Sequence, residues 1–404
     1  MSEDIEVSVV IPTLNEEITI GYCVEKAVKT LERLGIKGEV IISDSYSKDR
    51  TVEIAVSKGA RVVYQPLRGY GNAYHKGIKE AKGKIIIIGD ADNTYDFSDL
   101  EKFIRPLKNG ECDLVMGNRL NDTIEKGAMP WLHRYIGTPI MTWVLNRLFK
   151  TNISDCNCGM RAFTKEAYEK LNLKSPGWEY ASEMVIKAGL VGLRIKEVDI
   201  TLHRDMEGRK PHLNPWKAAW NNFKLMFMFS ARYLFLIPGI ILTLLGLTIF
   251  LPLMVTGENS LIWLGKIGLG NLSLVGSSFM ILIGLQLIWF AIFMRVYIFY
   301  HRLNFIDKKL KFFLNSPIFK TENGAILSLL LFIVGIILLG ITFFRWAEEG
   351  FAGNPNSFRI FITGCLLTFS AIQTFFSYFV LNTFLDEIRF NLGTEGTISY
   401  RENK

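Results

Sequence analysis

VSVVIPTLNEE, residues 7–17, decides the fold of the first half of the chain. Residues 7–12 form a continuous apolar run, which is typical of a strand buried on both faces. Apolar residues then recur at helical spacing from Ile18 to Leu31, and we expect Asn15 to cap that helix. The chain therefore opens with a strand followed by a helix.

The same alternation of apolar runs and helical segments continues along the chain. Further strand-like runs are expected at residues 39–43, 61–64, 84–88 and 113–116. Strands that alternate with helices favour an α/β domain with a mostly parallel, Rossmann-like sheet.

Polar residues follow these runs, where the carboxyl ends of parallel strands place ligands. Pro12, Asn15 and Glu16 follow the first run, and Asp44 follows the second. Asp90 and Asp92 follow the run at 84–88 with one residue between them. Two carboxylates at one strand end repel each other unless a cation lies between them. A Mg²⁺ or Mn²⁺ ion, also held by a diphosphate, fits this pattern.

The second half of the chain has the composition of a membrane domain. Four runs of 20 or more residues lack any charged side chain, and we take them as transmembrane helices at about 233–255, 272–294, 325–344 and 360–385. The connection at 295–324 carries Arg295, Arg302, Lys308, Lys309, Lys311 and Lys320 against two acidic residues, Asp307 and Glu322. By the positive-inside rule this connection, the first domain and the tail at 386–404 are expected in the cytosol.

Residues 214–232 precede the first membrane run and have an amphipathic pattern. Aromatic residues recur at helical spacing with lysines between them: Trp216, Trp220, Phe223 and Phe227, with Lys217 and Lys224. We expect an interfacial helix along the lipid headgroups, and an ordinary surface helix is the alternative.

Charge and cysteine content exclude other classes. The net charge of +7 over 404 residues comes from basic residues that gather beside the membrane runs, which favours lipid headgroups over nucleic acid as the partner. The five cysteines are an odd number at irregular spacing, so a disulfide framework is not expected. Cys156 and Cys158 lack the further ligands of a metal site, and packing is the preferred interpretation.

The motifs in order resemble those of family-2 glycosyltransferases with the GT-A fold: VVIPTLNEE, SDSYSKDRT, RGYGNA and GDADNTYDF. MGNRL, KGAMPWLHRYIG, DCNCGMRAF and GWEYASEM are similar to motifs of dolichyl-phosphate mannose and glucose synthases. This resemblance covers residues 7–213. It implies a catalytic GT-A domain at 1–213, the interfacial helix at 214–232, a four-helix membrane domain at 233–385 and a tail at 386–404.

The resemblance also assigns site residues. It implies a nucleotide-sugar pocket of Pro12, Asn15, Glu16, Asp44, Asp90, Arg204 and Lys210. It implies metal ligands at Asp90, Asp92 and Thr94, although mannose synthases carry a glutamine where this chain has Thr94. Arg119 and Arg134 match the residues that hold the acceptor phosphate. The catalytic set is then Asp92, Arg119, Arg134 and Arg204.

The implied reaction is an inverting transfer of one hexose, glucose or mannose, to dolichyl or polyprenyl phosphate at the cytosolic membrane face. UDP-glucose or GDP-mannose is the implied donor, and the product is a lipid-linked sugar for protein glycosylation. A lipid phosphate is already anionic near neutral pH, so a strong general base is not required. Glu179 and Glu183 therefore stay open between a sugar or base role and a structural role.

Two rival functions are weighed against this one. A processive polysaccharide synthase is expected to carry a Gln-x-x-Arg-Trp motif before its membrane helices, and residues 210–232 contain no glutamine. A lipid-linked sugar flippase with a non-catalytic domain is expected to have ionisable residues inside its spans, and these four runs have none. The membrane is a plasma membrane or an endoplasmic reticulum.

Overall fold

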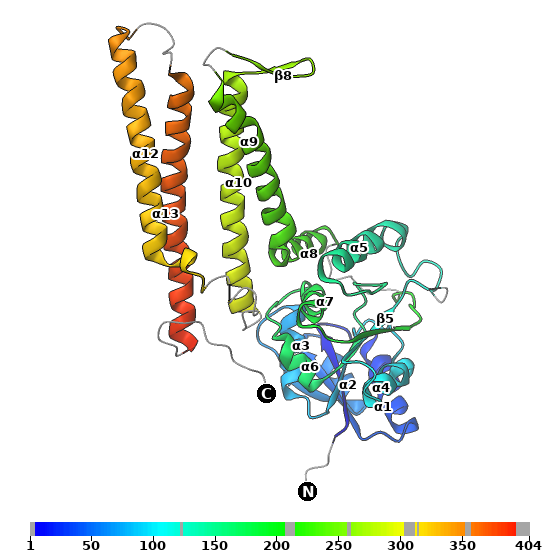
Figure 1. Ribbon diagram of the computed structural model, residues 1–404. Coiled ribbons are helices and arrows are strands. Elements are labelled where there is room, and N and C mark those ends of the chain that lie inside the picture. The colour runs from blue at the N-terminus through cyan, green and yellow to red at the C-terminus, as the bar shows by residue number, and fades with distance from the viewer. Residues whose placement is uncertain are drawn as a thin grey trace. The chain divides into compact units, whose positions relative to one another are not determined.

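A computed structural model describes residues 5–121, 124–206, 215–256, 260–302, 312, 315–351 and 357–392. The chain divides into two compact units, Met1–Met226 and Phe227–Lys404. The first unit is an α/β domain, and the second consists mainly of long helices (Figure 1).

In the described part of the first unit, seven strands form one sheet. They are β1 (Val7–Thr13), β2 (Gly38–Asp44), β3 (Arg61–Tyr64), β4 (Ile85–Ile88), β5 (Leu114–Asn118), β6 (Arg161–Thr164) and β7 (Ile195–Asp199), in the order β3-β2-β1-β4-β6-β5-β7. Strands β1 to β4 pair in parallel, and so do β5 and β7. Only β6 runs antiparallel to its neighbours, β4 and β5. The expected mostly parallel α/β sheet is confirmed.

Helices follow most strands. They are α1 (Ile20–Arg33), α2 (Thr51–Ser57), α3 (Tyr70–Glu80), α4 (Leu100–Lys108), α5 (Thr138–Phe149), α6 (Lys165–Leu171) and α7 (Tyr180–Val191). The apolar face of α1, which includes Cys23, Val24 and Ala27, packs against the alternate residues of β1 in the main core. Burial of such a stripe against a sheet face supplies most of the stability of these helices.

The expected helix cap at Asn15 is wrong. Helix α1 begins at Ile20, and Asn15 adopts a left-handed backbone with φ +56°. Its side-chain oxygen instead accepts a hydrogen bond from the backbone N–H of Lys48 at 2.8 Å. The amide thus ties the loop after β1 to the loop after β2.

Among the described residues of the second unit, four helices are long and apolar enough to cross a membrane: Arg232–Val255, Asn271–Tyr300, Thr321–Glu348 and Phe358–Ile388. They correspond to α9 (Ile237–Val255), α10 (Asn271–Tyr297), α12 (Thr321–Glu348) and α13 (Phe358–Leu392), with short π-helical extensions at Arg232–Leu236 and Ile298–Arg302. A small hairpin of β8 (Ile262–Leu264) and β9 (Ile267–Leu269) joins α9 to α10. Helix α8 (Pro215–Phe229) lies in the predicted interfacial segment, with Trp220 exposed and Met226 buried.

Small residues bring these helices together in two pairs, α9 with α10 and α12 with α13 (Figure 1). A Cβ atom on Gly284 would lie 2.7 Å from the carbonyl oxygen of Gly239, and one on Gly335 would lie 3.0 Å from that of Gly364. Such close backbone approach is how membrane helices associate without a hydrophobic driving force.

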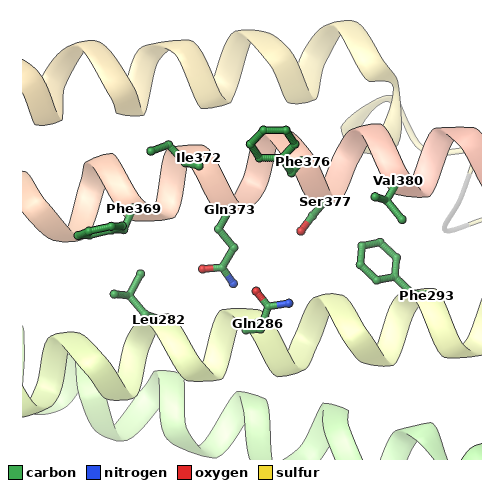
Figure 2. Close-up of a pocket in the computed structure, with 9 residues that line it drawn as sticks. All are labelled: Leu282, Gln286, Phe293, Phe369, Ile372, Gln373, Phe376, Ser377 and Val380. Carbon is green, nitrogen blue, oxygen red and sulfur yellow. The ribbon is translucent and has the colours of Figure 1, made fainter.

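A cavity of about 460 Å³ separates the two helix pairs midway along α10 and α13. Apolar clusters close the contact on either side of it, one around Leu274 and Leu366 and the other around Trp289 and Tyr378. Gln286 and Gln373 point toward one another across the cavity (Figure 2). The side-chain nitrogen of Gln373 is buried and finds no hydrogen-bond partner among the described residues.

Candidate active site

Asp90 lies directly beyond β4, at the carboxyl edge of the sheet. Two tyrosines of α3 donate hydrogen bonds to its Oδ1 atom, Tyr70 at 2.8 Å and Tyr74 at 3.2 Å. Burial and the neighbouring negative charge of Asp92 raise the pKa of Asp90 to about 6. A cation beside the two carboxylates would remove this penalty.

Asp92 is oriented by a residue expected to be a metal ligand. Its Oδ1 atom accepts hydrogen bonds from the backbone N–H and the hydroxyl of Thr94, at 3.0 and 2.6 Å. Thr94 thus fixes the direction of the Asp92 carboxylate, and its role as a third ligand stays a prediction. No group of three or more His, Cys, Asp or Glu side chains in the described part of the chain suits a metal ion. An ion held by Asp90 and Asp92 would need ligands from a substrate.

The DCNCG segment, residues 155–159, lies just before β6 and places Gly159 against the carboxylate of Asp90. A Cβ atom on Gly159 would lie 2.6 Å from Oδ2 of Asp90, so only glycine fits without moving that carboxylate. The backbone N–H of Gly159 also donates to the hydroxyl of Tyr95 at 2.8 Å. Cys156 and Cys158 are fully buried, and burial raises the pKa of the Cys158 thiol to about 12.

Arg204 lies on a loop anchored beside the two aspartates. The backbone N–H of His203 donates to the carbonyl of Thr94 at 2.9 Å. Arg204 donates through its backbone N–H to Glu125 at 2.9 Å and through Nε to the carbonyl of Lys126. Arg204, which the resemblance assigns to the nucleotide-sugar pocket, thus lies on a loop that contacts the loop of Asp92 and Thr94. Lys210 and Arg209 lie outside the described residues.

Arg119 is engaged by a carboxylate rather than directed into open space. Its Nε and Nη2 atoms donate to the two oxygens of Asp155 at 2.7 and 2.9 Å. The Asp155 side chain is 0% exposed and that of Arg119 is 13% exposed. Burial disfavours the charged guanidinium, but the negative charge of Asp155 outweighs it and raises the pKa of Arg119 well above its usual range. Its acceptor role stays a prediction, and its clear contact is this buried pair.

Arg134 lies in a surface of exposed apolar side chains. It belongs to a π-helical segment, His133–Gly137, that leads into α5, and its guanidinium lies 5.3 Å from the ring of Tyr135. We call this surface the aromatic face; its exposed members are Trp131, Leu132, Tyr135, Ile136, Ile140 and Trp143. Trp131 is 66% exposed and Trp143 is 67% exposed, which is unusual for residues of this size. Arg134 makes no ion pair with a described residue.

The expected nucleotide residues hold two loops together at the edge of β1 and β2. Asp44 is fully buried, and its oxygens accept hydrogen bonds from the Thr13 hydroxyl at 3.0 Å and the Ser47 backbone N–H at 2.9 Å. Glu16 is buried, and its backbone N–H donates to the Thr51 hydroxyl at 2.8 Å. Pro12 pairs with Ser43 in the sheet register. The structure thus brings Pro12, Asn15, Glu16 and Asp44 to one edge.

Comparisons with known proteins agree with this architecture. Residues 8–172 match the model "Glycosyl transferase family 2", and residues 292–385 match "Glycosyltransferase family 2 C-terminal transmembrane region". The chain is 36% identical over 348 residues to the low-salt glycan biosynthesis hexosyltransferase Agl6 of Haloferax volcanii, covering 86% of this chain and 82% of that protein. The chain belongs to glycosyltransferase family 2.

Other relatives match about half of this glycosyltransferase. An uncharacterized protein of Methanocaldococcus jannaschii, MJ1222, is 38% identical over 203 residues, covering 48% of this chain and 80% of that protein. A crystal structure of glucosyl-3-phosphoglycerate synthase from Mycobacterium tuberculosis is 23% identical, with a TM-score of 0.45, and covers 56% of this chain and 80% of that one. The first unit has the GT-A fold, and the two matched regions with the four apolar helices make the enzyme an integral membrane protein.

Glu183 of the glycosyltransferase makes buried contacts within the catalytic unit. It is fully buried, forms an ion pair with Lys187 at 3.0 Å, and accepts hydrogen bonds from the backbone N–H groups of Lys174 and Ser175 at 3.0 and 2.7 Å. Both backbone hydrogen bonds go to Oε2 and fix the loop before α7, while Oε1 faces the Lys187 ammonium in a fully buried ion pair. Glu179 accepts a hydrogen bond from Gly177 at 3.3 Å and is half-buried.

Proposed function

We propose that this glycosyltransferase moves one hexose from a nucleotide sugar to a dolichyl or other polyprenyl phosphate at the cytosolic membrane face. The observation that carries the proposal is the aromatic face with Arg134 within it. Tryptophan and tyrosine favour the membrane–water interface, and a guanidinium among them suits a lipid phosphate. The segment that carries the aromatic face follows directly on Glu125 and Lys126, and these two residues accept hydrogen bonds from Arg204.

The donor side follows from the strand ends. We assign the base and ribose to the edge formed by Pro12, Asn15, Glu16 and Asp44. The two neighbouring carboxylates of Asp90 and Asp92, the second of which adds to the effect of burial in raising the pKa of Asp90, fit a Mg²⁺ or Mn²⁺ ion shared with a diphosphate. Asp90 and Asp92 would hold that ion, which when bound supplies charge neutralisation of the leaving nucleoside diphosphate. Arg204 adds a cation on the same side, and Lys210 is assigned there by resemblance.

The acceptor side needs no proton transfer. A phosphate oxygen of the lipid attacks the anomeric carbon, the bond to the nucleoside diphosphate breaks on the opposite face, and the configuration inverts. The lipid phosphate is already anionic near neutral pH, which is consistent with Glu183 being committed to structure. Catalysis then depends on positioning the two charged reactants and on electrostatic stabilisation of the leaving group.

The hexose donor and the cytosolic location of the catalytic unit are supported by separate observations. The relative Agl6 is named as a hexosyltransferase of glycan biosynthesis, which favours a hexose donor here. The six basic residues of the 295–324 connection support a cytosolic catalytic unit. The product of such an enzyme is a lipid-linked sugar that serves as a donor for glycosylation.

The test uses the purified full-length protein in detergent with dolichyl phosphate and Mg²⁺ or Mn²⁺. Labelled UDP-glucose and GDP-mannose are supplied separately, and label is sought in the organic phase. We expect one donor to give an acid-labile lipid that carries a single sugar. Label in a polymer, or free sugar alone, would contradict the lipid acceptor.

A pair of variants separates the acceptor side from the donor side. Arg134→Gln is expected to raise the KM for dolichyl phosphate about tenfold, because a phosphate loses one charged hydrogen-bond donor, while the KM for nucleotide sugar stays unchanged. Arg105→Gln, at an exposed arginine of α4, is the matched control and should change neither.

A further inference from the structure

Tyr46 has a backbone conformation that its side chain disfavours. It lies in the turn after β2 with φ +60°, in the left-handed region that costs an ordinary residue about 1–2 kcal/mol. Bulky residues are rare there. The ring is not buried in compensation, because 58% of Tyr46 is exposed.

Neighbouring residues fix the turn without help from the Tyr46 side chain. The Ser47 hydroxyl donates to Asp44 at 2.5 Å and accepts a hydrogen bond from the Asn15 backbone N–H at 2.8 Å. The Ser47 backbone N–H donates to the other oxygen of Asp44 at 2.9 Å. A glycine would satisfy this backbone with no strain. Strain that local structure does not require points to a function of the side chain.

The Tyr46 ring stacks on a second exposed tyrosine. Tyr64 is the last residue of β3, pairs with Asp44 in the parallel register, and is 49% exposed. The ring centroids lie 5.6 Å apart, and the ring planes meet at 28°. We call the two rings the tyrosine ledge. It lies beyond the carboxyl ends of β2 and β3, beside the edge that we assign to the base and ribose.

We infer that the tyrosine ledge stacks the base of the nucleotide sugar. This inference rests on the proposed function, and it names the group that binds the base. A flat, exposed aromatic surface at the carboxyl edge of a parallel sheet is suited to a planar heterocycle. Stacking recognises the face of a base and not its edge, so it tolerates both uracil and guanine. The ledge therefore provides affinity, and the choice between UDP and GDP sugars lies with other groups.

The test measures binding to the full-length protein in detergent by calorimetry, with Mg²⁺ and with UDP, GDP or inorganic pyrophosphate as probes. Tyr46→Gly is expected to raise the Kd of UDP and GDP about tenfold and to leave that of pyrophosphate unchanged. Its thermal midpoint should equal or exceed that of the wild type, because glycine relieves the strain. Tyr46→Phe keeps the ring and should keep the affinity.

Controls make the outcomes distinct. Tyr22→Ala removes a tyrosine that is 55% exposed on α1 and should leave all three affinities unchanged. Unchanged UDP and GDP affinities in Tyr46→Gly would overturn the inference, and so would an equal loss for pyrophosphate, which would mean that the whole turn had moved. Binding needs no lipid, so a base-dependent loss upholds the ledge even if transfer to dolichyl phosphate fails. A wild-type protein that binds neither nucleotide overturns both proposals.

Discussion

Replacing Arg119 should lower the stability of the catalytic unit, whatever the effect on acceptor binding. Arg119→Met leaves the Asp155 carboxylate, which is 0% exposed, without its cation. Breaking one partner of a buried ion pair costs about 3–5 kcal/mol. For a unit of roughly 200 residues this lowers the thermal midpoint by about 6–20 °C. The midpoint is read from intrinsic fluorescence of the full-length protein in detergent.

A second variant isolates the pair. Arg119→Met with Asp155→Leu removes both charges and should recover most of the lost stability, because apolar replacement of a buried pair is often neutral. Burial acts to raise the pKa of Asp155, but the Arg119 charge outweighs it and the pKa of this carboxyl is lowered. The stability it contributes is therefore present above about pH 4 and is lost as pH falls through the lowered folded value. The double variant should lack this part of the acid sensitivity.

One result would refute the reasoning. If Arg119→Met kept the wild-type midpoint and raised only the KM for dolichyl phosphate, the guanidinium would be an acceptor ligand and not a structural partner. A matched loss in the control Arg105→Met would show instead that any arginine removal has this effect.

Three other predictions follow from single contacts. Thr94→Val should lower kcat about tenfold while Thr94→Ser keeps it, because the hydroxyl orients Asp92 at 2.6 Å; equal rates in steady-state assays would contradict this. Gly159→Ala should reduce activity at least about tenfold, because its Cβ displaces the Asp90 carboxylate, and an unchanged rate with an unchanged midpoint would disprove the crowding. Gln373→Leu should stabilise the membrane unit by about 1–3 kcal/mol in detergent unfolding, because the change removes a buried amide nitrogen that has no hydrogen-bond partner among the described residues. A lower stability would show that this amide is hydrogen-bonded.

The sequence predicted the parts of the fold that depend on long apolar runs. Strand β4 is a fully buried run, β1 is buried at every residue except Pro12, and the four spans are longer than any soluble core requires. The sequence pattern did not predict strand β6, because it begins with Arg161 and arginine is usually exposed. The structure buries this arginine, and the carbonyls of Cys156, Cys158 and Ala181 accept its hydrogen bonds.

The candidate site was predictable where its residues are adjacent in sequence. Asp90 and Asp92 share one strand end, so their spacing alone brought them together. Arg119 was assigned to the acceptor phosphate by resemblance, and its pairing with Asp155 was not predicted because the partner is distant in sequence and no local pattern reveals it. The aromatic face was not predicted either, although Trp131, Tyr135 and Trp143 recur near helical spacing. The sequence does not show whether such side chains are buried or exposed, and only the folded structure shows that these are exposed.

Two unfavourable local energies in the catalytic unit lie at the carboxyl edge of its sheet. The pKa of Asp90 is raised because the carboxyl is buried and a second carboxylate lies beside it, and Tyr46 is strained in a turn where glycine would be relaxed. Neither cost stabilises a neighbouring core residue, and folded proteins tolerate such conflicts mainly at functional sites. A bound nucleotide with a divalent ion would offset both at once, through charge neutralisation at Asp90 and stacking at Tyr46. The donor should therefore stabilise this unit by more than its contacts with the two loops alone would give.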